Sequence, residues 1–288
     1  MSSKTDTEWL RETEPIPYQP NETDDGSSLF DEMKLQPTVR SKMSSRLRRA
    51  ILPLLGGKRE SNHFHFGIIT PVFDGALQSL KLLRHDLISQ YHTDWTWMLC
   101  SNGYSSVIAK FAQRKSQLTR GRVVTYTYLE HEPTPDPVSL LSNVAKRRDY
   151  CIDTIDADVI FTIDADAKII DREMFSTIDS ELYKTKKRIC IYRILFDASP
   201  TKTLPIFPIT FARIDSLNFC VEAKVAKAVG YPTGGSVSLF GNEFHYLYRA
   251  YQFCNREYLF INRVFAEHNG NRHYENLLNL RLQGDAAA

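Results

Sequence analysis

The sequence predicts an α/β domain with a mostly parallel central sheet and helices on both of its faces. Its 288 residues, of which 42% are hydrophobic, are enough to build one large domain of this class. Four apolar strand-like runs alternate with helical patterns between residues 63 and 163, and such alternation is typical of parallel sheets covered by helices. The fourth run ends directly in two carboxylates, as expected for a buried strand that leads into a ligand site.

The first half of the domain contains the clearest elements. Residues 63–70 are rich in strand formers and end at a proline, and the leucines that follow at 77, 80, 83 and 87 mark one face of a helix. Further strands are expected at 95–101, 122–128 and 159–163, with helices at 105–118 and 138–150 between them. In the less regular second half we expect helices at 172–183, 218–229 and 243–253 and strands at 188–195 and 206–212.

The N-terminal residues 1–60 differ in composition from the rest and are expected to form a disordered or loosely docked arm. Residues 1–36 carry nine acids against three bases, a local net charge of −6. Residues 37–59 carry seven bases and no acids, with apolar residues at helical spacing, which predicts a short basic amphipathic helix. We expect a single catalytic domain over 61–283 and a short tail at 284–288.

Composition excludes some classes of function. The 36 Lys and Arg residues nearly balance the 34 Asp and Glu residues, and a net charge of +2 argues against nucleic-acid binding through general basicity. The five cysteines have no metal-ligand spacing and lie mostly in apolar runs, so we expect buried reduced thiols and a cytoplasmic location. No apolar stretch is long enough for a secretion signal or a spanning helix.

Asp164 and Asp166 form the most informative motif. They follow the apolar strand 159–163 at positions i and i+2, and in extended backbone both side chains point to the same side. Two carboxylates at the end of a buried strand can hold Mn²⁺ or Mg²⁺, whose remaining positions go to water and phosphate oxygens. The alternative is that they solvate the strand end or cap the next helix.

Three further segments resemble family 2 glycosyltransferases, which have the Rossmann-like GT-A fold. Ile69-Thr70-Pro71-Val72-Phe73-Asp74 is similar to the family's opening strand and loop, and residues 143–166 resemble the helix, turn and strand that lead into its DxD motif. Gly241-Asn242-Glu243-Phe244 is similar to the later acidic motif that holds the catalytic base. The resemblance covers roughly residues 70–275, and the order of the motifs is more specific than any one of them.

The resemblance implies a site that binds a nucleotide-diphospho-sugar. It implies Glu243 as the catalytic base, Asp164 and Asp166 as metal ligands, and His268 as a third ligand, although His268 could equally be a turn residue bonded to backbone. The donor contacts that it implies are Thr70, Pro71, Phe73, Asp74, Asn102, Arg148, Asp164 and Ala165. For Thr70, Asp74 and Arg148 the alternatives are a strand end, a helix cap and a solvated helix face.

One departure from the family pattern lies after the second strand. The family usually has aspartates there, whereas this chain has Asn102, which can donate and accept hydrogen bonds but carries no charge. The resemblance therefore leaves the nucleotide base open.

The function implied by the resemblance is that of a metal-dependent inverting glycosyltransferase, acting in cell-surface glycan or polysaccharide synthesis on a glycan or lipid-linked acceptor. A peripheral contact of residues 40–59 with the inner face of a membrane would fit a lipid-linked acceptor, and a homo-oligomer is left open. The alternatives are a nucleotidyltransferase, which would use the same two acids but attack phosphorus, and a catalytically silent sugar- or nucleotide-binding scaffold.

Overall fold

The computed structural model describes residues 63–115, 121–134, 137–196, 202–207, 209, 214–233 and 242–269. The predicted N-terminal arm at 1–60, with its basic amphipathic helix, and the predicted tail at 284–288 lie outside the described residues.

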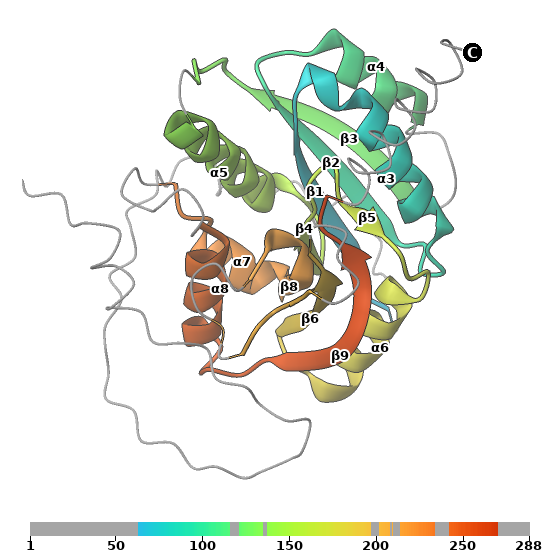
Figure 1. Cartoon of the computed structure of the whole chain (residues 1–288), viewed down its shortest axis with the longest axis vertical. Helices are drawn as coiled ribbons and strands as arrows, with labels where there is room; N and C mark the ends of the chain where they lie inside the picture. Colours follow the sequence, from blue (N-terminus) through green and yellow to red (C-terminus); the bar gives the residue numbers. More distant parts are fainter. Residues whose placement is uncertain are drawn as a thin grey trace, which may run out of the picture. The chain divides into compact units, whose positions relative to one another are not determined.

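The first half of the domain is a run of parallel strands joined by helices, as Figure 1 shows. Strands pair in the order β3-β2-β1-β4, all parallel. Their bounds, with those of the connecting helices, are β1 Phe66–Val72, η2 Asp74–Ala76, α3 Leu77–Ser89, β2 Trp95–Asn102, α4 Ser106–Lys115, β3 Arg122–Leu129, α5 Pro137–Thr154 and β4 Val159–Thr162. Each strand and helix predicted in this half is confirmed, with shifts of a few residues at the ends.

The second half extends the same sheet with strands of both directions. Beyond β4 the order continues β8-β6-β9-β5, and β7 pairs with β6. The bounds are β5 Lys168–Ile169, α6 Met174–Thr185, β6 Ile189–Leu195, β7 Thr203–Leu204, η3 Ser216–Asn218, β8 Phe219–Glu222, α7 Ala223–Val229, α8 Asn242–Phe253 and β9 Leu259–Glu267. Strands β1 to β4, β6 and β9 run in one direction and β5, β7 and β8 in the other, so the described sheet is mostly parallel, as predicted.

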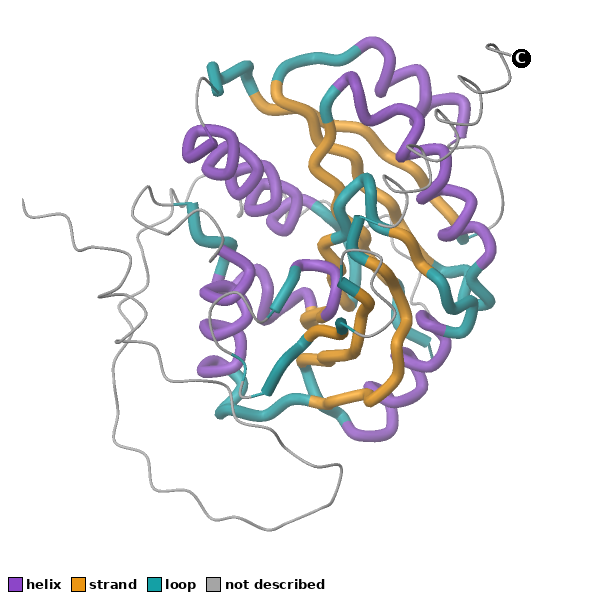
Figure 2. The backbone as a smooth tube through the Cα atoms, viewed as in Figure 1, coloured by secondary structure: helices purple, strands orange, loops and turns teal. Residues whose placement is uncertain are grey.

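Each face of the sheet is covered by its own set of helices, and Figure 2 shows the strands between them. Helices α3, α4 and α6 pack on one face, where Leu83, Phe111 and Phe175 share a core with Phe161 of β4. Helices α5, α7 and α8 pack on the other, where Ile152 and Leu247 share a core with Ile160 of β4. Because neighbouring residues of β4 point to opposite faces, this short apolar strand lies at the centre of both cores.

The two tryptophans of β2 and the two histidines just before β1 have structural roles. The indole rings of Trp95 and Trp97 are buried, and Trp97 contacts Phe111 edge to face. His65 is bonded through Nδ1 to Asp94 at 2.7 Å and through Nε2 to Thr96 at 3.0 Å. His63 likewise pairs with Asp179 of α6. These histidines fix strand β1 to its surroundings and are not arranged as metal ligands.

One prediction in the second half was wrong at its start. The helix expected over 218–229 begins only at Ala223, because Phe219, Cys220 and Val221 are buried as strand β8 between β4 and β6. A position between two strands of a sheet favours β-branched and aromatic residues as a strand, and this tertiary pairing overrides the local helical pattern. The strand expected at 206–212 lies mostly outside the described residues and stays a prediction, and the described strand before it is β7 at Thr203–Leu204, just before Pro205. Within the described part of the chain, no helix is both long and apolar enough to cross a bilayer.

Gly67 in β1 offers a test of this packing. A Cβ atom at this position would lie 2.8 Å from Cβ of Ala157 and 2.8 Å from Cδ1 of Ile155. Since a packed core has little room to yield, we expect Gly67→Ala to lower the free energy of unfolding by about 1–3 kcal/mol in urea denaturation. Gly75→Ala is the control, because its Cβ would meet only the ring of Phe73, which is 69% exposed and can swing into solvent. Equal effects of the two substitutions would contradict the packing described for β1.

Candidate active site

The site lies where β1 and β4 end side by side. The hydroxyl of Thr70 donates to the carbonyl of Ile163 at 2.7 Å and accepts from Nε1 of Trp97 at 2.9 Å. The Thr70 hydroxyl therefore both donates and accepts a hydrogen bond inside the sheet. These bonds fix the point at which the chain leaves β4. The direct donor contact expected of Thr70 stays a prediction. Asp164 follows immediately, at the carboxyl edge of the sheet where α/β proteins bind their ligands.

Arg148 is the centre of the site. Its side chain, from α5, is only 3% exposed, and it donates from Nη2 to Oδ1 of Asp164 at 2.6 Å and from Nη1 to Oε1 of Glu243 at 2.7 Å. Nη1 also donates to the hydroxyl of Tyr231 at 2.7 Å. One buried guanidinium thus joins the residue implied as a metal ligand to the residue implied as the base. The alternative of a solvated helix face is wrong for Arg148.

The electrostatics keep Arg148 charged. Burial alone would lower the pKa of its guanidinium, but the neighbouring carboxylates of Asp164 and Glu243 raise this pKa well above its ordinary value. Burial raises the pKa of Tyr231, so its phenol remains protonated at neutral pH. Two carboxylates facing one guanidinium leave a net negative charge, which favours a cation at this edge.

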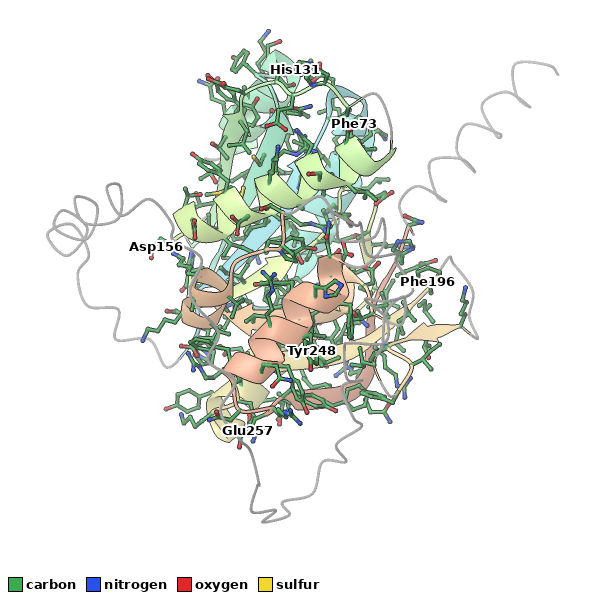
Figure 3. All side chains as sticks on the ribbon, turned by 90° about the vertical axis from the view of Figure 1, so that its left-hand side faces the viewer. Phe73, His131, Asp156, Phe196, Tyr248 and Glu257 are labelled. Atoms are coloured by element: carbon green, nitrogen blue, oxygen red, sulfur yellow. The ribbon has the colours of Figure 1, made fainter. Side chains whose placement is uncertain are left out.

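Glu243 is held at the N-terminus of a helix, as the sequence predicted. It lies in the first turn of α8, whose residues Phe244 and Leu247 are buried behind it. Figure 3 shows α5 and α8 on the same side of the molecule, with Tyr248 marking α8. The preceding Gly241 lies outside the described residues. Within the described part of the chain, both hydrogen bonds of the Glu243 carboxylate use Oε1, which leaves Oε2 for a further partner.

A third side of the site comes from residues 215–218. Oγ of Ser216 accepts from Nη2 of Arg148 at 3.2 Å and donates to Oδ2 of Asp164 at 3.4 Å. Asp215 accepts from the backbone N–H of Leu217 at 2.8 Å and caps η3. Sequence reasoning missed Ser216, although Asp215 followed by Asn218 three residues later is a recognisable capping signal.

His268 lies beside Asp215. Its Nε2 is 3.6 Å from Oδ2 of Asp215, and its ring stacks on Phe196 at 4.7 Å. Burial raises the pKa of Asp215 to about 6, while His268 opposes this shift and Asp164 adds to it. Among the described residues, no group of three or more His, Cys, Asp or Glu side chains could by itself hold a metal ion. The three-ligand set of Asp164, Asp166 and His268 therefore stays a prediction.

The remaining predicted donor residues lie along the same edge. Phe73 and Asp74, directly after β1, are exposed, and no capping bond from a side chain is formed at the start of η2. Pro71 is half-buried in β1, and Ala165, between the two aspartates, is buried. Their predicted donor contacts remain predictions.

Asn102 joins two segments of the chain at the end of β2. Its Oδ1 accepts from the backbone N–H of Glu132 at 2.9 Å and its Nδ2 donates to the carbonyl of Glu132 at 2.8 Å. Oδ1 also accepts from Nδ2 of Asn143 at 3.2 Å. Asn102 thus ties the loop after β3 to the end of β2, and its contact with a donor base stays a prediction.

Comparisons with solved structures agree with this fold. The 1–349 fragment of S. aureus TarS matches with a TM-score of 0.53 and 12% sequence identity, over 70% of this chain and 59% of that one. The same fragment in complex with UDP matches with a TM-score of 0.53 and 11% identity, over 70% and 60%. Its complex with UDP-GlcNAc matches with a TM-score of 0.51 and 11% identity, over 70% and 58%. The chain therefore spans less than two thirds of these TarS chains.

These matches establish the fold class. The chain shares the fold of TarS, which confirms the predicted GT-A-like α/β architecture with a mostly parallel sheet between helices. At 11–12% identity the likeness extends to the fold alone. No family sequence model matches the chain, and no curated protein sequence matches it significantly.

The ion pairs of Arg148 can be tested against a neighbouring pair on the same helix. We expect Arg148→Gln to lower the free energy of unfolding by about 3 kcal/mol or more, because Asp164 and Glu243 lose the buried cation that compensates them. Lys146→Gln also removes a cation from α5, but its partner Glu132 is exposed, so the loss should be much smaller than for Arg148→Gln. Urea denaturation of both variants gives the comparison. An Arg148→Gln loss as small as that of Lys146→Gln would show that the cluster contributes little to the fold.

Proposed function

We propose that the protein is a metal-dependent inverting glycosyltransferase that moves a sugar from a nucleotide-diphospho-sugar to an acceptor hydroxyl. One observation carries the proposal: Arg148 holds Asp164 and Glu243 together at the carboxyl edge of a GT-A-like sheet. A cation-binding carboxylate beside a second carboxylate is the set of groups that such a transfer requires. The TarS complexes with UDP and UDP-GlcNAc, which share the fold, support a nucleotide-sugar as donor.

Glu243 is the proposed base. Arg148 and Tyr231 engage Oε1 and fix the carboxylate, so that Oε2 can accept the proton of the acceptor hydroxyl as it attacks the anomeric carbon. Attack from the face opposite the leaving diphosphate inverts the anomeric configuration. Two other carboxylates fit the role of base less well. Glu222 pairs with Val159 at the start of β4, whereas Asp164 follows the end of that strand. Asp215 lies at the site but is engaged in capping η3.

The donor side of the site fits a hard divalent cation. The side chain of Asp164 is 43% exposed despite its bond to Arg148, and Asp166 is half-exposed in the turn that follows. Carboxylate oxygens are the ligands that Mg²⁺ and Mn²⁺ prefer, with phosphate oxygens of a substrate completing the shell. Such a cation would neutralise the charge that builds on the departing diphosphate. Arg148 orients Asp164 for this role.

The wider role follows from the same proposal. A glycan or lipid-linked acceptor would place the enzyme in cell-surface glycan or polysaccharide synthesis, in the cytoplasm, with residues 40–59 contacting the inner face of a membrane. Seven bases at 37–59 support that contact. Reaction products separate the proposal from a nucleotidyltransferase, because the first releases a nucleoside diphosphate and the second pyrophosphate.

Donor binding should depend on the cation and on both aspartates. In a thermal-shift screen of nucleotide-sugars, we expect one donor to stabilise the protein in the presence of Mn²⁺, by about 2.7 kcal/mol at 100 times its dissociation constant. Asp164→Asn and Asp166→Asn should each weaken this stabilisation and nearly abolish turnover. Asp156→Asn is the control, because Asp156 is exposed and lies just before β4, whereas Asp164 follows the other end of that strand. Donor binding and turnover unchanged by EDTA would refute the metal dependence.

Glu243→Gln should separate chemistry from binding. The change keeps the shape of the side chain and removes the base, so we expect turnover to fall by roughly 10²–10⁴ with donor affinity little changed. Glu222→Gln is the matched control, because Glu222 is salt-bridged to Arg188 at the other edge of the sheet and should leave turnover near normal. Near-normal turnover in Glu243→Gln would transfer the role of base to Asp215.

A further inference from the structure

A groove lies between α3 and α4, on the sheet face opposite α5 and α8. The two helices run next to each other over the β1 and β2 side of the sheet (Figure 1), and the groove between them has a volume of about 470 Å³. Its lining consists of three apolar and four basic residues: Leu77, Val107, Phe111, Lys81, Arg84, Lys110 and Arg114. None of these residues belongs to the site around Arg148.

The lining residues share one face of each helix. Leu77, Lys81 and Arg84 follow one another at i, i+4 and i+7 along α3, and Val107, Phe111 and Arg114 do so along α4. Phe111 is packed against Trp97 of the core, whereas Val107 is 40% exposed. The groove therefore has a fixed apolar floor that opens to solvent.

The four cations have no acidic partner within the described part of the chain. Helix α4 contains no Asp or Glu, and the one acid of α3, Asp86, accepts from the backbone N–H of Ile169 of β5. Lys81 bonds only to the neutral Oε1 of Gln78, at 3.3 Å. No ion pair is formed by Arg84, Lys110 or Arg114 among the described residues, so positive charge concentrates around an apolar floor.

Arg84 is the most constrained of the four. It is half-buried, and its Nε is buried without a hydrogen-bond partner among the described residues. Burial lowers the pKa of its guanidinium, because no nearby carboxylate offsets the loss of hydration. A buried donor without an acceptor is unfavourable. An anion in the groove would accept from Nε and would also compensate the charge of the partly dehydrated guanidinium.

We propose that the α3–α4 groove binds an anionic phospholipid of a membrane leaflet, with its phosphate among the four cations and an acyl chain along Leu77, Val107 and Phe111. Charge complementarity requires an anion, and the apolar floor requires that the anion carry a hydrocarbon chain. A free phosphate would leave the floor uncovered. This site is distinct from residues 40–59 and does not depend on the reaction proposed above.

Vesicle co-sedimentation of the full chain tests the proposal. We expect binding to phosphatidylglycerol-containing vesicles at low salt and none to phosphatidylcholine vesicles. The groove variant Lys81→Gln, Arg84→Gln, Lys110→Gln, Arg114→Gln should bind at least roughly 10²-fold more weakly. The control variant Lys184→Gln, Lys186→Gln, Lys224→Gln, Arg249→Gln removes the same charge from exposed positions elsewhere and should bind within a few fold of the unmodified chain. Equal losses in both variants would overturn the proposal.

Three further measurements keep the result interpretable. A triple variant that retains Arg84 alters only Lys81, Lys110 and Arg114, which are exposed, so it should keep the fold and still lose most of the binding. Binding that survives in the groove variant but disappears on deletion of residues 37–59 would assign the membrane contact to that segment and overturn the groove proposal.

By calorimetry, soluble dihexanoyl-phosphatidylglycerol should bind at least roughly ten times more tightly than glycerol phosphate. Equal affinities would identify a site for free phosphates and equally overturn it.

Discussion

A single buried guanidinium constrains the architecture of the candidate site. Arg148 has to be compensated, because an unpaired charge in the interior costs several kcal/mol, and its partners come from four separate segments: the end of β4, the start of α8, η3 and the chain after α7. Those segments are far apart in the sequence. Their meeting at one side chain fixes the carboxyl edge of the sheet, and it brings two carboxylates closer together than they would lie without a cation between them.

The sheet determines why this meeting occurs where it does. Strand β4 is four residues long and wholly buried, so the chain must become polar as soon as it leaves the sheet. Thr70 fixes that exit point, because its hydroxyl donates to the carbonyl of Ile163 and accepts from Nε1 of Trp97. Asp164 then lies beside α5, where it accepts from Arg148. The buried residues of α5, such as Ile152, pack on the sheet and hold that helix in place. A buried frame thus supports an edge that is negatively charged and partly open to solvent.

The parts of this arrangement that are local in sequence could be predicted, and those that depend on distant contacts could not. The four apolar runs, the last of which ends at Asp164, predicted the first four strands, and the helical patterns between them predicted the connecting helices. Strand β8 was missed because Phe219, Cys220 and Val221 become a strand only through the slot between β4 and β6. Similarly, the sequence placed Arg148 at a donor site by resemblance, but nothing local indicates that it bonds Asp164, Glu243 and Ser216 at once.

The most direct test of the account is where manganese and a nucleotide bind. Crystals grown with Mn²⁺ and the nucleoside diphosphate that stabilises the protein most would locate the metal by its anomalous scattering. The account predicts a peak in direct or water-bridged contact with the carboxylates of Asp164 and Asp166, with the diphosphate beside it at the carboxyl edge of β1 and β4. A metal peak and nucleotide at another place, such as the groove between α3 and α4, would contradict it.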